Sequence, residues 1–428
     1  MQAVDRTKAP QIHDFTGFKP EKPVVSLLGN GIALKQFVNP QLDLLHFIIK
    51  IKAGRYYESK KNAALFCYLL LKESSSQYSC SEVDEFLDYY GVSYTANVTI
   101  EYAIIKLIIP RNNCFKVLPY IFDFLAHPSF KEKNLEILRQ RKLMDLAYNQ
   151  ERVSYCASQL MLHHIFGDQN PAGQIQTEEL LKDVSIEDIR QYYQQSFCAE
   201  NIRLYVAGNL DNNILQTLTQ LFETIPHGQT TLLSTPQHIV TPLSEPIIDY
   251  HKECIQSSFF LCQQGIAHND TRRRDFNILS TILGGYFGSR LMSNLRETHG
   301  FTYGISCDNL YFNQSSVFYI ESEVNVDVTR QAIEECKKEI DRLGQETMPA
   351  EELELVKSYM TGQLLRKVDN TVAYMTQYCQ WDEFDCDEQE FELQMQSIQD
   401  FTSEKSMQLA KDLLQTKNFT TIISGNIQ

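Results

Sequence analysis

Apolar and polar positions follow two different periods along the chain, and these periods separate predicted strands from predicted helices. Apolar residues at every third or fourth position indicate amphipathic helices, whereas short apolar or alternating runs indicate strands. The predicted strands span residues 45–51, 102–109, 258–262 and 317–324, and the predicted helices span residues 62–72, 81–90, 114–126, 131–166, 331–343 and 350–366. This mixture predicts an α+β fold in which each sheet carries helices on one face.

One stretch of this pattern occurs twice, 217 residues apart. Residues 184–211 and 401–428 align without a gap, so that Ser185 is matched by Thr402 and Gly208 by Gly425. Each copy predicts a helix that begins at a hydroxyl N-cap, followed by a short apolar strand that ends in Gly-Asn. A period of this length is far longer than the roughly 20–50 residues of a repeat array. We therefore expect two homologous domains in tandem.

A polar segment between the two copies indicates the domain boundary. Residues 227–231 are polar, and Pro236, Pro242 and Pro246 follow them. This is the composition of a linker. We therefore expect a first domain over residues 1–225, a linker over residues 226–245 and a second domain over residues 246–428.

Composition narrows the class of protein. The chain has 428 residues, with 39 basic and 54 acidic side chains and a formal net charge of −15, which argues against nucleic acid and anionic membranes as main partners. The 11 cysteines include no Cys-x-x-Cys pair, so neither a disulfide framework nor a structural zinc knot is expected. The longest apolar run, residues 63–71, is about half of what crosses a bilayer, and the first residues lack the apolar core of a signal peptide. We expect a cytoplasmic protein.

A motif rich in glycine and arginine stands in the second half. Residues 283–291 read LGGYFGSRL, and residues 295–303 read LRETHGFTY. The motif resembles the pattern L-G-G-x-x-x-S-R-L…R-E-x-x-G-x-x-Y of the insulinase/pitrilysin-type zinc peptidases, or inverzincins, which include mitochondrial processing peptidase and bacterial heterodimers. The resemblance extends from the strand near residue 45 to Gly425. It implies a LuxS/MPP-like metallopeptidase fold, with two homologous domains in tandem that are each a mainly antiparallel sheet with helices on one face.

The same resemblance indicates where the inverted zinc motif H-x-x-E-H of the family belongs. It matches Leu65 and Leu69 to the two histidine ligands, and Tyr68 to the glutamate that acts as general base. No histidine lies between His46 and His127. Two histidines at i and i+4 share one helix face and can bind one Zn²⁺, whereas leucine offers no ligand atom. Tyrosine, with an ordinary pKa of about 10, is a poor base for this reaction.

The family's third zinc ligand is a glutamate, which the resemblance matches to Asp145, 76 residues after Leu69. Aspartate can bind zinc, but its side chain is one carbon shorter than glutamate and it would be the one ligand left. The adjacent His163 and His164 point about 100° apart on a helix, and His127, His251, His268 and His299 have no second histidine at ligand spacing. We therefore expect no metal and no cofactor in this chain, and zinc in a partner subunit.

Two residues of the second-half motif match substrate-holding residues of the family. In that family an arginine and a tyrosine seven residues apart contact the bound peptide across the cavity, and they correspond to Arg296 and Tyr303. A guanidinium offers several fixed donors and a phenol one more, so the pair can hold a peptide carbonyl or the oxyanion formed when water attacks it. Outside such a motif, a solvated arginine and a packed tyrosine would be the ordinary interpretation.

The first half thus lacks hydrolytic groups, whereas the second half keeps substrate-holding groups. The resemblance predicts the catalytically defective, zinc-free subunit of a heterodimeric insulinase-type metalloendopeptidase, inactive alone, which holds unfolded peptide for a zinc-bearing paralogous subunit. A non-enzymatic structural or assembly subunit of the same fold is the alternative. The predicted partners are the paralogue and the peptide, with no nucleic acid and no membrane; the sequence leaves open whether a homodimer forms when the paralogue is absent.

Overall fold

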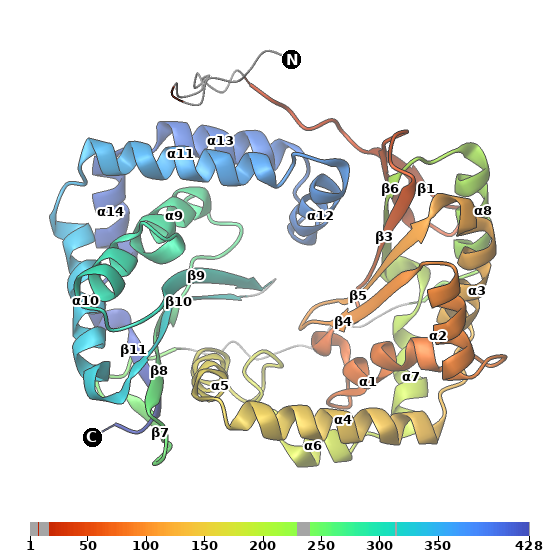
Figure 1. Cartoon of the computed structure of the whole chain (residues 1–428), viewed down its shortest axis with the longest axis horizontal. Helices are drawn as coiled ribbons and strands as arrows, with labels where there is room; N and C mark the ends of the chain where they lie inside the picture. The colour runs from red at the N-terminus through yellow and green to blue at the C-terminus, as the bar shows by residue number, and fades with distance from the viewer. Residues whose placement is uncertain (1–6, 8–16, 229–239, 313–314, 428) are drawn as a thin grey trace.

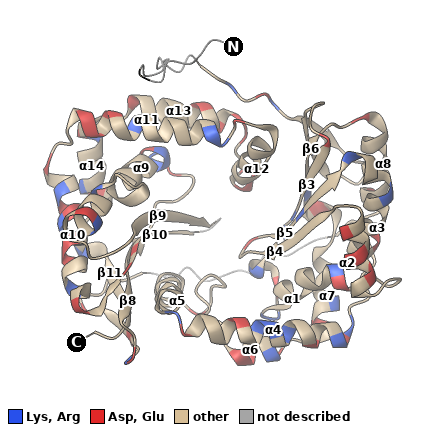
Figure 2. Cartoon of the chain, in the orientation of Figure 1, with Lys and Arg blue, Asp and Glu red and all other residues tan. Residues whose placement is uncertain are grey.

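The chain folds into two lobes, each built on one sheet. The computed structural model describes residue 7 and residues 17–228, 240–312 and 315–427. Figure 1 shows the first half of the chain, in red to yellow-green, mainly on the right, and the second half, in green to blue, on the left. Charged residues of both signs lie along outer helices such as α4 (Glu132–Gln150) and α10 (Thr329–Gln345) (Figure 2).

The first lobe contains a six-stranded sheet in the order β1-β2-β6-β3-β5-β4. Its strands are β1 (Val24–Leu27), β2 (Ala33–Val38), β3 (Leu44–Ile51), β4 (Ser93–Val98), β5 (Ala103–Pro110) and β6 (Ile202–Gly208). Neighbouring strands are antiparallel except β2 and β6, which are parallel. The other helices of this half are α1 (Ala63–Leu70), α2 (Cys80–Tyr89), α3 (Cys114–Ala126), α5 (Val153–Phe166), α6 (Glu178–Lys182), α7 (Ile186–Ser196) and α8 (Asn212–Phe222).

The second lobe contains a five-stranded sheet in the order β7-β11-β8-β10-β9. Its strands are β7 (Ile247–Tyr250), β8 (Gln256–Gln264), β9 (Ile305–Phe312), β10 (Ser315–Asn325) and β11 (Thr420–Gly425). Only β7 and β11 pair in parallel among the described strands of this sheet. The other helices are α9 (Arg273–Ser280), α11 (Ala350–Arg366), α12 (Thr371–Trp381), α13 (Gln389–Asp400) and α14 (Ser403–Leu413), with two π-helical segments, η5 (Thr281–Gly285) and η6 (Met292–Thr298).

The two sheets repeat one topology. The order β2-β6-β3-β5-β4 in the first lobe corresponds to β7-β11-β8-β10-β9 in the second. Gly208 and Gly425 end equivalent strands with φ of 139° and 143°, a conformation that side-chain-bearing residues rarely adopt. The predicted α+β fold with two homologous domains in tandem is therefore confirmed. Residues 229–239 of the predicted linker lie outside the described residues, and the domain limits stay predictions.

The helix predicted over residues 131–166 is in fact two helices. α4 ends at Gln150 and α5 begins at Val153, and Arg152 between them is extended, with φ −95° and ψ 115°. The break lets α5 leave the first lobe. Its buried Ala157, Met161 and Ile165 pack with residues of β8 and β11 in the second lobe. Helical periodicity alone does not reveal a change of packing partner, which is why one continuous helix was predicted.

In the same way, α12 of the second half packs against the sheet of the first lobe. In β6, Leu204 belongs to the core of the first lobe, whereas Tyr205 points to the opposite face and packs among residues of the second half, because successive strand residues face opposite sides. On that face, the ring of Phe37 from β2 lies 5.2 Å from the ring of Tyr374 in α12. Each sheet is thus covered on one face by helices of its own half of the chain, and on the opposite face by a helix of the other half. Among the described residues, no helix is long and apolar enough to cross a membrane.

Candidate functional site

The N-terminus of α1 is held by a buried carboxylate. Glu58 accepts hydrogen bonds from the backbone N–H of Asn62 at 3.0 Å and of Ala64 at 2.9 Å. Asn62, the residue before the helix, has a left-handed backbone with φ 68°. Burial raises the pKa of Glu58 to about 7, although the two backbone N–H groups and the nearby Arg55 lower it. α1 is therefore fixed in place at the position that the sequence assigned to the zinc motif.

The three zinc-motif positions of α1 do not form a polar site. Tyr68 is fully buried, and its hydroxyl lies 2.8 Å from Ser196 Oγ at the end of α7. Burial raises the pKa of this phenol well above its ordinary value, so it is no base at neutral pH. Leu65 and Leu69 are partly buried and pack against the core of the first lobe.

The structure brings Asp145 to the same cavity as Leu65. This cavity, of about 360 Å³, lies between α1, α4 and α5, and its lining also includes Arg55 and Tyr155. The carboxylate of Asp145 is paired with Lys142 Nζ at 2.9 Å. Tyr68 and Leu69 do not line this cavity. Among the described residues, the lining contains one carboxylate, which is paired with lysine, and no histidine or cysteine. This set does not fit the three or four nitrogen, sulfur or oxygen ligands that Zn²⁺ requires, so no catalytic step is assigned to this place.

We expect Glu58 to make stability depend on pH. Its pKa of about 7 in the folded chain lies above the ordinary value of 4.5, so the folded state binds more protons than the unfolded state between these values. The stabilising contribution is fully present below about pH 4.5 and is lost as the pH rises through about 7, with a slope of at most about 1.4 kcal/mol per pH unit. Denaturant unfolding between about pH 5 and pH 8 should show this slope in the wild type and a flatter profile in Glu58→Gln.

Glu85→Gln is the matched control for that measurement, because Glu85 is an exposed glutamate on α2. It should keep the wild-type profile. Identical pH profiles for the wild type and Glu58→Gln would show that Glu58 does not titrate in this range.

Most residues of the second-lobe motif hold the fold together. A Cβ at Gly284 in η5 would lie 3.0 Å from the backbone nitrogen of Cys307 in β9, so glycine allows the close contact between these elements. Arg290 makes two hydrogen bonds to the carboxylate of Glu352 in α11, at 2.7 and 3.0 Å. Gly300, just after η6, has φ 65°, which favours glycine.

Arg296 and Tyr303 have no such packing role. The guanidinium carbon of Arg296 lies 4.4 Å from the ring centre of Phe287, a cation–π contact,. In the described part of the chain, the one carboxylate within 4 Å of Arg296 is that of Glu297, at 3.8 Å. Tyr303 is 91% exposed. On this well-packed segment, the Tyr303 hydroxyl is therefore presented to solvent, and the guanidinium of Arg296 is partly exposed.

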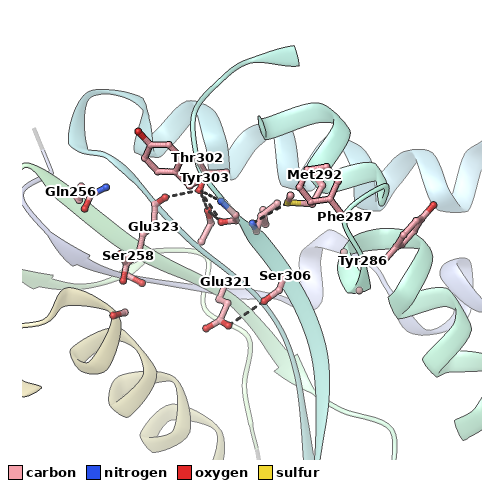
Figure 3. Close-up of a pocket in the computed structure, with 16 residues that line it drawn as sticks. Gln256, Ser258, Tyr286, Phe287, Met292, Thr302, Tyr303, Ser306, Glu321 and Glu323 are labelled. Carbon is pink, nitrogen blue, oxygen red and sulfur yellow. Dashed lines mark hydrogen bonds between the residues drawn. The ribbon is translucent and has the colours of Figure 1, made fainter. Parts of the chain in front are cut away.

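Tyr303 and Phe287 line a cavity of about 660 Å³ in the second lobe (Figure 3). Its lining also includes Gln256 and Ser258 of β8, Ser306 of β9, Glu321 and Glu323 of β10, and Ser154 of α5. Ser306 Oγ donates to Glu321 Oε1 at 3.2 Å, and burial raises the pKa of Glu321. Arg296 does not line the cavity, but Phe287 connects the two. The cavity lining offers the Tyr303 hydroxyl as a hydrogen-bond donor and the Glu321 and Glu323 carboxylates as acceptors, which the carbonyl and N–H groups of a polypeptide segment can meet,.

Sequence reasoning placed Arg296 and Tyr303 on this segment but missed Phe287, Glu321 and Glu323. Phe287 belongs to the same sequence motif, so its position there was a signal that could have identified it. The two glutamates are two residues apart in β10 and therefore point to the same side of the strand. Only the tertiary arrangement shows that this side faces the cavity. The assignment of Arg296 and Tyr303 as substrate-binding residues stays a prediction.

Comparison with known proteins gives consistent matches. Models described as insulinase (peptidase family M16) and as peptidase M16 inactive domain match residues 39–175 and 183–360. An uncharacterized zinc protease of Rickettsia bellii is 24% identical over 82% of this chain and 85% of its own length. A protein of Helicobacter pylori named non-peptidase homolog YmxG is 19% identical over 70% and 69%.

A solved structure described as the peptidase M16 inactive domain from Pseudomonas fluorescens superposes with a TM-score of 0.83. It is 16% identical, and the match covers 95% of this chain and 98% of that one. At this identity the structural likeness shows the fold alone.

Proposed function

Because the chain belongs to the insulinase family of peptidases (M16), with two M16 domains in tandem, we propose that it is the substrate-holding subunit of a two-subunit peptidase and that it carries no catalytic zinc. The observation that carries the proposal is the contrast between the lobes. At the zinc-motif positions, Tyr68 is buried and Asp145 is paired with Lys142. In the second lobe, by contrast, Tyr303 is exposed at a cavity that is large enough for peptide side chains.

In this proposal the partner is a paralogous subunit with an intact H-x-x-E-H motif. Zinc in that subunit would lower the pKa of a bound water and so supply the nucleophile. Arg296 and Tyr303 of this chain would donate hydrogen bonds to the peptide carbonyl across the shared chamber, and would stabilise the negative charge that develops on its oxygen. Phe287 would hold the Arg296 side chain in place through the cation–π contact,.

The substrate class in this proposal is unfolded peptide in the cytoplasm. An extended segment can enter a chamber closed by two such subunits, whereas a folded domain cannot. Neither nucleic acid nor a membrane is a proposed partner, in keeping with the net charge of −15,.

A non-enzymatic structural or assembly role is the second candidate. The relative in Helicobacter pylori is named a non-peptidase homolog, and the first-lobe site of this chain offers no zinc ligand set. The exposure of Tyr303 favours the substrate-holding role, because a purely structural subunit has no need of an exposed phenol on a rigid segment.

Mixing the chain with a zinc-bearing paralogue from the same organism tests the proposal. The chain alone should leave unfolded fluorogenic peptides intact, and the mixture should cleave them in a chelator-sensitive reaction. Size-exclusion chromatography should show a heterodimer, with an interface on the order of 2,000 Å² or more if the pairing is obligate. Cleavage by the chain alone, or a paralogue that is fully active without it, would contradict the proposal. Complex formation without any gain in activity would favour the assembly role.

A further inference from the structure

Three side chains with metal-binding atoms meet where the first half of the chain crosses to the second sheet. Cys156 on α5, Asp249 on β7 and His251 just after β7 each place one ligand atom within 4.8 Å of the others. All three are half-buried. This cluster lies outside the zinc-motif cavity and outside the cavity lined by Tyr303.

The backbone explains why the three side chains converge. Asp249 and His251 are two residues apart along an extended segment, so they face the same side. The segment is fixed by pairing with β11, and the backbone N–H of His251 donates to Gly425 O at 3.1 Å. Cys156 lies in the first turn of α5, which packs across β8 and β11. The donor atoms are therefore held by regular elements and not by a loop tip.

A neighbouring hydroxyl, that of Ser424, orients Asp249 in the manner of an outer coordination shell. Asp249 Oδ2 lies 2.7 Å from His251 Nε2 and accepts a hydrogen bond from the buried Ser424 Oγ at 2.9 Å. Such second partners fix the rotamers of metal-binding side chains. The site thus resembles a preformed set of ligands more than a chance surface cluster.

We propose that Cys156, Asp249 and His251 bind one divalent transition-metal cation of the Zn²⁺ class, with water at the fourth position. Thiolate, imidazole and carboxylate together are a Zn²⁺ ligand set. The cation would fasten α5 of the first half to β7 of the second. This proposal departs from the expectation of no metal in this chain, because these ligands come together only through the fold and their spacing in the sequence does not reveal them.

Cobalt titration of the full chain tests the site. Chelator-treated protein should bind one Co²⁺ per chain, with the thiolate-to-cobalt charge-transfer absorption of a cysteine ligand, and Zn²⁺ should displace it. Cys156→Ser should remove that absorption, and Cys156→Ser and His251→Ala should each weaken binding by more than about 100-fold. Ser424→Ala, which removes only the hydrogen bond to Asp249, should weaken it by about 10-fold.

Two controls separate this site from other binding. His227→Ala removes another histidine paired with a carboxylate, that of Glu200 at 2.7 Å, and Asp145→Asn removes the aspartate of the first-lobe cavity. Both should bind Co²⁺ like the wild type. Binding of well under one Co²⁺ per chain, or unchanged affinity in the two ligand variants, would overturn the proposal. Loss of binding in Asp145→Asn alone would place the metal in the first lobe and overturn both this inference and the proposal that the chain carries no catalytic zinc.

Discussion

Arg296→Ala and Tyr303→Phe should each lower turnover of the assembled two-subunit peptidase by about 10²–10³-fold, the usual cost of losing one donor to the transition-state oxyanion. Both side chains stand on a segment that is rigidly packed elsewhere, through Arg290, Glu352 and Gly300. The substitutions should therefore leave complex formation and the zinc content of the partner unchanged. Steady-state kinetics on a defined peptide gives the size of the effect.

The division between kcat and KM distinguishes two roles for these residues. A donor to the developing oxyanion affects kcat and kcat/KM alike, whereas a contact made equally to bound substrate appears mainly in KM. Arg330→Ala removes an exposed arginine elsewhere in the second lobe and should be silent. Tyr68→Phe should also leave turnover nearly unchanged, since its hydroxyl contacts only buried Ser196 among the described residues. If Tyr68→Phe abolishes activity and Arg296→Ala does not, the division of roles between the lobes is wrong.

Asp382→Asn should destabilise the chain by about 3–5 kcal/mol, because it removes the buried counter-charge of the buried Lys35 and the partly buried Arg203,. Asp382 follows α12 and is only 12% exposed. Its Oδ1 lies 2.5 Å from Lys35 Nζ and its Oδ2 lies 3.1 Å from Arg203, both on the first sheet. Tyr205 also donates a hydrogen bond to it. Burial alone would raise the pKa of Asp382, but the hydrogen bonds from Lys35 and Tyr205 and the charge of Arg203 hold it below its usual range.

Asp385→Asn is the matched control, because Asp385 pairs with the same Arg203 at 3.5 Å but is 89% exposed. Exposed ion pairs contribute about 0–1 kcal/mol, and asparagine tolerates the left-handed backbone of Asp385, with φ 54°,. Denaturant unfolding followed by two probes should give a large loss for Asp382→Asn and almost none for Asp385→Asn. Equal losses would show that the Asp382 cluster does not fasten α12 to the first sheet.

The tandem α+β fold could be predicted because it depends on local patterns. Helical and strand periods located most elements, and α11 agrees residue for residue with the predicted helix at 350–366. The match of Gly208 with Gly425 in the sequence corresponds to two equivalent strand ends with nearly the same backbone angle. Such features depend on the chemistry of a few neighbouring residues, which a sequence displays directly.

The features that the sequence did not reveal depend on which elements, far apart in the chain, pack against each other in the fold. The apolar stripe of α5 looks the same whether it covers the first sheet or the second, so the break at Arg152 was missed. The cluster of Cys156 with Asp249 and His251 joins residues far apart in the chain, as does the buried pairing of Asp382 with Lys35. For the candidate site, Arg296 and Tyr303 came from a resemblance, and the structure added the exposure of Tyr303 and the carboxylates of Glu321 and Glu323 in the lining of the cavity.

Because α5 packs on the sheet of the second lobe and α12 on the sheet of the first, neither lobe can complete its packing early in synthesis. α5 is complete at Phe166, but β11, one of the two strands it covers, ends at Gly425. At about 5–20 residues per second, translation of the intervening segment takes on the order of ten to fifty seconds. During that time the apolar face of α5 and the Tyr205 face of the first sheet have no native cover. The first lobe therefore leaves the ribosome unfinished, and chaperone capture or premature termination in this interval should affect it more than a lobe that closes on itself.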